Sequence, residues 1–218
     1  MGNLKDAIDA YNAQKKEKLP AEVLAIMDRC VEELEASGIE QRALRTGNTM
    51  PDFTLPNQHG QSRRLSEYLS HSPIVLNIYR GSWCPYCNLE MKALHDALPE
   101  FRARGVNLVG MAPEVPDRSL ALVEKHGLAI DILSDTGNRI SEQMGLVFEL
   151  PEVLRPIYLN SGTDLPAFNG SGNFKLPMPA TYIVDRNSTI VFDFVKADYR
   201  LRVEPEEILA RLDELQLS

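Results

Sequence analysis

Apolar residues recur at helical spacing through the first 45 residues of the chain. Asn3 followed by Asp6 has the pattern of a capped helix start, and Pro20 stands where a first helical turn tolerates proline. A second helical stripe, which Gly38 would end, consists of Val23, Leu24, Met27, Cys30, Val31 and Leu34. These two stretches predict an N-terminal helical arm over residues 1–45.

From residue 46 onward, short apolar runs alternate with helical stretches. The run from Ile74 to Tyr79 is almost continuously apolar, which is typical of a strand buried on both faces of a sheet. Further strands are predicted over 106–112, 130–133, 181–184 and 189–195. Helices are predicted over 65–69, 85–104, 119–126, 138–144 and 205–215, with a kink or break at Pro99. Residues 150–174, rich in Pro, Gly and Asn, are expected to be irregular.

This alternation indicates an α/β fold, with one domain over residues 46–218 after the arm. Hydrophobic residues make up 44% of the 218 residues and charged residues 25%, so a buried core can form. The formal net charge of -8 argues against non-specific nucleic-acid binding. No apolar run reaches the roughly 18 residues of a membrane span, and the polar start of the chain lacks a signal-peptide core. We therefore expect a cytoplasmic protein that binds neither nucleic acid nor membranes.

The three cysteines are too few for a disulfide scaffold. Cys84 and Cys87 form a Cys-x-x-Cys between the predicted strand 74–79 and the helix that follows. A helix N-terminus has unpaired N–H groups and a partial positive charge, and both favour a thiolate over a thiol. Cys87 lies one helical turn further on, close enough for a disulfide with Cys84. We predict thiol redox chemistry at this pair, and a buried structural role for Cys30 on the apolar stripe of the arm.

Other interpretations of the pair are weaker. Zinc normally needs four ligands, but the chain has no second Cys-x-x-Cys and its four histidines are scattered. A Cys–His hydrolase needs a base beside its nucleophile, yet His95, the nearest histidine in sequence, would lie about 16 Å along the helix from Cys84. Two unreactive cysteines would not explain their place between strand and helix. We expect neither a metal nor an organic cofactor.

Three segments carry ordered motifs: Met50–Leu55 followed by Gly60, Arg80–Cys87, and Met178–Asp185. Together they resemble the thioredoxin-fold superfamily, and within it the peroxiredoxin-like branch of the alkyl hydroperoxide reductase and thiol-specific antioxidant family. The resemblance covers about residues 47–215. It implies a thioredoxin-like fold, in which helices flank a central mixed sheet, with the arm as an N-terminal extension.

The resemblance allows two alignments of the cysteines. Peroxiredoxins carry Thr-x-x-Cys-x-x-Glu after a strand; aligned in this way, Cys87 is the peroxidatic cysteine, Glu90 matches the Glu, and Cys84 replaces the Thr. Thioredoxins carry Trp-Cys-x-x-Cys; aligned in this way, Trp83 matches, Cys84 attacks and Cys87 resolves. Which of the two cysteines attacks first stays open at this point.

The resemblance also indicates residues that would bind substrate. The arginine that holds peroxide in peroxiredoxins is replaced here by Pro179. In thioredoxins the matching residue is a cis-proline, and the backbone before it, here at Met178, pairs with an extended disulfide substrate. Arg80 could supply the missing guanidinium. The predicted catalytic residues are Cys84 and Cys87, and the predicted substrate-binding residues are Arg80, Trp83, Met178 and Pro179.

Three functions are consistent with this pattern. The first is a thiol-dependent peroxidase that reduces hydrogen peroxide or alkyl hydroperoxides and is recycled by thioredoxin or a similar dithiol. The second is a thioredoxin-like oxidoreductase that acts on disulfides. The third is a non-catalytic redox-sensing module. The apolar stripe of the arm needs a partner surface, which could belong to the same chain or to the second subunit of a homodimer.

Overall fold

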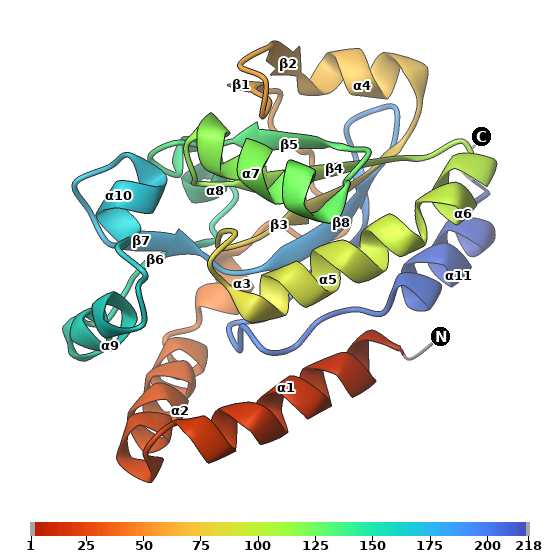
Figure 1. The fold of residues 1–218 in the computed structure, drawn as a ribbon. Helices are drawn as coiled ribbons and strands as arrows, with labels where there is room; N and C mark the ends of the chain where they lie inside the picture. Colours follow the sequence, from red (N-terminus) through yellow and green to blue (C-terminus); the bar gives the residue numbers. More distant parts are fainter. Residues whose placement is uncertain (1–2, 217–218) are drawn as a thin grey trace.

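A computed structural model describes residues 3–216 and places a five-stranded mixed sheet at the centre of the molecule (Figure 1). The strand order is β5-β4-β3-β8-β9. The three strands β3, β4 and β5 are parallel, whereas β8 runs antiparallel to β3 and β9 antiparallel to β8. The strands are β3 (Ile74–Ile78), β4 (Asn107–Ala112), β5 (Asp131–Ser134), β8 (Ala180–Val184) and β9 (Ile190–Val195). The predicted central mixed sheet is confirmed.

Both faces of this sheet are buried, as the apolar run in β3 predicts. Ile74, Leu76 and Ile78 belong to a core that also contains residues of α3 (Ile39–Arg42), α4 (Leu65–His71) and α8 (Arg139–Gln143). Val75 and Tyr79 point into a second core on the other face. That core is covered by α5 (Pro85–Asp96), α6 (Leu98–Ala103), α7 (Pro116–His126) and α11 (Pro205–Leu215).

The arm forms two helices, α1 (Leu4–Lys18) and α2 (Ala21–Ala36). The Asn3 side chain accepts a hydrogen bond from the Asp6 N–H at 2.7 Å, which confirms the predicted cap. Gly38 follows α2 with φ 71°, the left-handed conformation that ends a helix. In Figure 1, α1 lies along the outside of α5. Within residues 3–216, no helix is long and apolar enough to cross a membrane.

The predicted helix 85–104 is interrupted as Pro99 requires. α5 ends at Asp96 and α6 begins at Leu98, which places Pro99 in the first turn of α6. A first-turn proline lacks only an N–H that would be unpaired in any case, so the break costs little.

The expectation of an irregular segment over residues 150–174 is wrong. The segment contains a 3₁₀ turn (Glu152–Leu154) and the helices α9 (Arg155–Asn160) and α10 (Leu165–Asn169), and it lies between the paired strands β6 (Val147–Glu149) and β7 (Lys175–Pro177). Both helices are too short to show a helical repeat, and both carry proline in their first turn. Their prolines therefore mark helix starts rather than loop.

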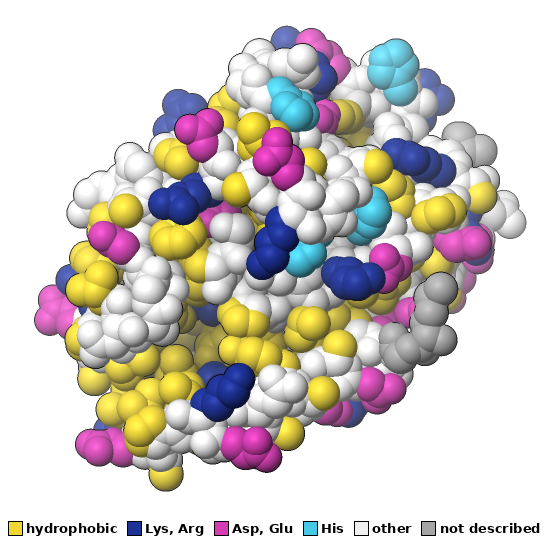
Figure 2. Space-filling view, in the orientation of Figure 1, with side chains coloured by type: hydrophobic (Ala, Val, Ile, Leu, Met, Phe, Trp, Pro, Cys, Tyr) yellow, Lys and Arg dark blue, Asp and Glu magenta, His cyan; other side chains and the backbone are white. Residues whose placement is uncertain are grey.

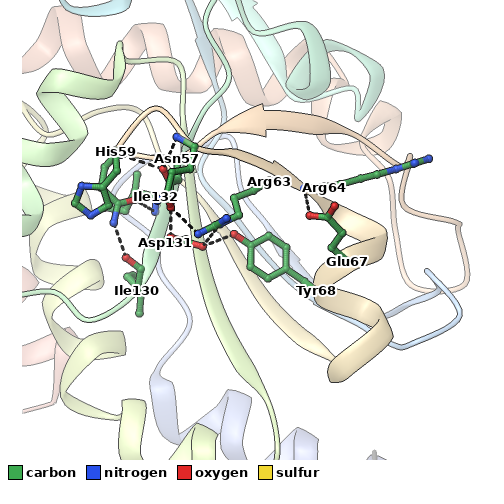
Figure 3. Close-up of polar contacts among 11 residues, drawn as sticks. Asn57, His59, Arg63, Arg64, Glu67, Tyr68, Ile130, Asp131 and Ile132 are labelled. Atoms are coloured by element: carbon green, nitrogen blue, oxygen red, sulfur yellow. Dashed lines mark hydrogen bonds and ion pairs between the residues drawn. The ribbon is translucent and has the colours of Figure 1, made fainter.

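A small antiparallel pair, β1 (Thr54–Pro56) and β2 (Ser62–Arg64), is fastened to the sheet through Asp131 of β5 (Figure 3). The Asp131 carboxylate accepts hydrogen bonds from Asn57 at 2.9 Å, Arg63 at 3.2 Å and the Tyr68 hydroxyl. Burial alone would raise the pKa of this carboxyl, but the three donors outweigh burial and lower it.

Replacing Asp131 with asparagine should therefore destabilise the protein. We expect a loss of about 1–3 kcal/mol of unfolding free energy at pH 7. The difference should shrink as the pH falls below about 4. The Asp131 carboxylate stabilises the fold at pH values above its pKa in the unfolded chain, and this contribution is lost as the pH falls through its lower pKa in the folded protein. Urea unfolding at pH 7 and at about pH 2.5 checks this. The exposed Asp213→Asn is the control and should cost less than about 1 kcal/mol; equal losses for both would contradict the role of Asp131.

Candidate active site

Cys84 occupies the residue directly before the first turn of α5, after the chain leaves β3. Its backbone is extended (φ -88°, ψ 114°), Pro85 begins the helix, and the Cys84 N–H donates to the Gly81 carbonyl at 3.1 Å. Cys84 and Cys87 are free thiols, and each is 1% exposed. The predicted place of the pair at a strand-to-helix junction is confirmed.

The turn before Cys84 is held by a buried carboxyl group from the neighbouring strand. Glu114, just after β4, accepts hydrogen bonds from the Ser82 N–H and from the Ser82 hydroxyl, both at 2.8 Å. Burial raises the pKa of Glu114 to about 7. Gly81 has φ 149°, and a Cβ there would lie 2.2 Å from Nε1 of Trp83, so only glycine fits beneath the indole.

The two thiols differ in acidity. Burial raises the pKa of Cys84, but the hydrogen bond with the Cys87 side chain and the charges of Arg80 and Arg202 outweigh burial and bring the pKa to about 6. Burial and the hydrogen bond with Cys84 raise the pKa of Cys87 well above its ordinary value. These surroundings favour the charged form on Cys84 rather than on Cys87.

Arg80 lies buried in an aromatic cage beside the pair. Its side chain is stacked 4.4 Å from the ring centroid of Tyr199 and 5.0 Å from that of Trp83, and it donates a hydrogen bond to the Tyr158 hydroxyl. Within residues 3–216, Nε of Arg80 and Nε1 of Trp83 are buried without a hydrogen-bond partner. The site therefore contains two buried donors without a protein partner.

A second buried arginine lies behind Cys87. Arg202 donates to the Cys87 sulfur at 3.4 Å and forms an ion pair with Glu90 at 2.7 Å, and both charged side chains are at most 2% exposed. Burial raises the pKa of Glu90 to about 7, although Arg202 opposes this. The resemblance indicated Glu90, but nothing in the sequence pattern pointed to Arg202.

Cys84 opens onto a pocket of about 570 Å³, whereas Cys87 is not among its lining residues. Arg80, Trp83 and Tyr86 line it from the domain, together with Tyr158 of α9 and Tyr199. Figure 2 shows hydrophobic side chains gathered around a hollow in the region of α1, α2 and α9, with basic groups at its edge. The opposite wall is formed by the arm.

The arm is fastened across this pocket. The N–H groups of Leu4 and Lys5 donate to the Glu204 carboxylate at 3.0 and 2.7 Å, so a negative charge lies at the start of α1. The Tyr86 hydroxyl donates to Asn12 at 2.6 Å. In this structure the arm thus packs on the domain of its own chain.

Met178 and Pro179 differ from what the resemblance implied. No cis peptide bond is found in residues 3–216, so Pro179 is trans. The N–H of Met178 already donates to the Leu146 carbonyl at 2.8 Å, and its side chain is fully buried. Neither residue lines the pocket at Cys84, while Arg80 and Trp83 do. The substrate-binding role of Met178 and Pro179 stays a prediction.

A free cysteine before a helix, with a second cysteine one turn on and a mixed sheet behind it, defines a thiol redox protein of the thioredoxin fold. The sequence matches the model of the AhpC/TSA family over residues 46–192, and the chain belongs to this family. The predicted family and fold are therefore confirmed.

Individual relatives agree with this assignment. Peroxiredoxin Q of Gentiana triflora chloroplasts is 27% identical over 161 residues, which cover 74% of this chain and 61% of the relative. Peroxiredoxin Bcp of Escherichia coli K12 is 28% identical over 103 residues, covering 47% of this chain and 65% of the relative. The match thus spans less than two thirds of the length of these two proteins.

Solved structures show the same fold. Peroxidoxin BcpB of Mycobacterium tuberculosis has a TM-score of 0.63 at 23% identity, covering 79% of this chain and 98% of that one. The reduced 2-Cys peroxiredoxin of Plasmodium vivax has a TM-score of 0.61 at 20% identity, covering 79% and 82%. These solved structures agree with the predicted thioredoxin-like fold.

Proposed function

We propose that this protein reduces hydroperoxides, with the Cys84 thiolate as the attacking group. The observation that carries the proposal is that the acidic thiol of the pair is the one that lines the pocket. Relatives and solved neighbours that are named peroxiredoxins support the reaction class.

The reaction has three balanced steps. The Cys84 thiolate attacks the terminal oxygen of R–OOH, the O–O bond breaks, and the leaving alkoxide takes a proton to become R–OH. Cys84 is now a sulfenic acid. The Cys87 thiol condenses with it, which forms the Cys84–Cys87 disulfide and releases water. An external dithiol, for which a thioredoxin-like protein is the proposed source, restores both thiols by disulfide exchange.

Peroxiredoxins have an arginine at the position of Pro179, and in this proposal Arg80 supplies the guanidinium group instead. Its charge favours the Cys84 thiolate, and its unpaired Nε is a donor for a peroxide oxygen. Trp83 offers a second donor at Nε1. Donors that are already oriented stabilise the charge that moves onto the oxygens as the O–O bond breaks.

The wild-type protein should react with hydrogen peroxide at least about a thousandfold faster than free cysteine at pH 7. The rate should rise with a midpoint near pH 6, because the Cys84 thiolate attacks and its pKa is about 6. In Arg80→Gln the midpoint should move upward by about one pH unit or more, since the neighbouring positive charge is gone. Stopped-flow oxidation between pH 4.5 and 9 measures both. A rate near that of free cysteine would remove the proposal.

A disulfide oxidoreductase is the second candidate. An acidic cysteine before a helix, preceded by tryptophan, would also attack a disulfide. Insulin reduction that requires Cys84, together with slow peroxide oxidation, would favour this candidate. A homodimer, a cytoplasmic location and a purely redox-sensing role stay predictions.

A further inference from the structure

The pocket at Cys84 differs in charge from the rest of the molecule. The chain carries a net charge of -8, yet the described residues that line this pocket include Lys15, Lys18 and Arg80 and no Asp or Glu. Even with the Cys84 thiolate counted, the cations of this wall outnumber its anions, and a concave wall of net positive charge attracts a negatively charged ligand. Two of the three cations come from α1 of the arm, outside the residues 46–192 that match the family.

Lys15 is held in a position facing aromatic groups. Its Nζ lies 3.3 Å from the Tyr199 hydroxyl and within 5.8 Å of the ring centroids of Tyr86 and Tyr199. Burial lowers the pKa of Lys15. An ammonium group that has lost water in this way gains from an anionic ligand more than a fully solvated one does.

The rest of the wall is mainly apolar and aromatic. The arm contributes Leu19, Val23 and Met27 to this wall, and α9 contributes Ile157. These side chains line the same pocket as Trp83. Hydrogen peroxide has only two heavy atoms and would fill little of this pocket. The pocket volume of about 570 Å³ is typical of sites that enclose small organic ligands.

We propose that this pocket is a binding site for organic hydroperoxides that carry a carboxylate. The inference rests on the proposed peroxidase function. The hydroperoxide group lies at Cys84, the apolar body packs against the arm and α9, and the carboxylate is bound by Lys15 and Lys18. The product is the corresponding hydroxy acid. A peptide thiol such as glutathione would also satisfy the cations, and Asn160, Ser161 and Thr163 of the same wall offer partners to its amide groups, so glutathione is the competing ligand.

The first test compares a hydroperoxy fatty acid with its methyl ester below their micelle concentrations. For the wild type, kcat/KM should be about tenfold higher for the acid, since a charge-assisted contact is lost in the ester. Lys15→Gln/Lys18→Gln should remove this preference, and Lys15→Arg/Lys18→Arg should keep it. The matched control Lys16→Gln removes an equal charge from an exposed position of α1 that does not line the pocket, and it should also keep the preference. Equal wild-type rates for acid and ester would overturn the inference.

The second test measures binding without chemistry, in Cys84→Ser protein. Trp83 is the only tryptophan of the chain and lines the pocket, so its fluorescence reports on occupancy. Decanoate should bind with a Kd about tenfold lower than decanol. Normal peroxide reduction without any preference for decanoate would overturn the inference alone. Decanoate preference in a protein that does not reduce peroxides would overturn the proposed function and support the anion site. A fluorescence response to glutathione but not to decanoate would also overturn the inference.

Discussion

Cys84→Ser should abolish rapid oxidation by hydroperoxides, with a loss of at least about a thousandfold in rate. The reason is that the proposed nucleophile is Cys84, whose pKa is lowered and which lines the pocket, while the pKa of Cys87 is raised. Stopped-flow mixing with hydrogen peroxide, followed by mass spectrometry of the protein, measures the loss.

Cys87→Ser is the matched variant. It should keep a fast first oxidation, because the nucleophile is intact, but stop at the Cys84 sulfenic acid, since no resolving thiol remains. Trapping with dimedone should label Cys84 in this variant. If Cys84→Ser reacted fast and Cys87→Ser slowly, Cys87 would be the peroxidatic cysteine and the alignment with peroxiredoxins would describe the site.

Removal of Arg202 should have the largest effect on stability. Arg202→Met leaves the Glu90 carboxyl buried without its partner, and we expect a loss of about 3–5 kcal/mol in unfolding free energy. The double variant Glu90→Leu/Arg202→Met should recover much of this, because no lone charge remains in the core. Urea unfolding followed by circular dichroism measures the three proteins.

An exposed pair on the same part of the chain provides the comparison. Arg211 and Glu214 form an ion pair on α11 with both side chains largely in solvent. Arg211→Met should therefore cost less than about 1 kcal/mol. A similarly small loss in Arg202→Met, or a double variant less stable than the single one, would show that Arg202 and Glu90 do not depend on each other.

The sequence was most informative where structure depends on near neighbours. The strand at Ile74–Ile78, the start of α5 at Pro85 and the break near Pro99 follow from runs, caps and prolines within a few residues. The Cys84–Cys87 pair was found for the same reason, because its spacing and its place before a helix are local properties.

Most of the surroundings of Cys84 could not be predicted in this way. Tyr158, Tyr199 and Arg202 reach the site from segments more than 70 residues away in sequence, and no periodic pattern marks them. α9 was missed because a helix of six residues is shorter than two helical turns and shows no repeat. Contacts of this kind depend on the chain being folded, so a single sequence does not reveal them.

The hydrogen bonds that hold α1 on the domain have a consequence for the reaction rates. A hydroperoxide is small enough to enter beside the arm, but a globular dithiol protein is not, and both sulfurs of the pair are almost completely covered. Oxidation needs no movement of α1. Re-reduction by a dithiol protein, the proposed reductant, would need α1 to move, and the contacts of Glu204 and Tyr86 with α1 would then oppose that step.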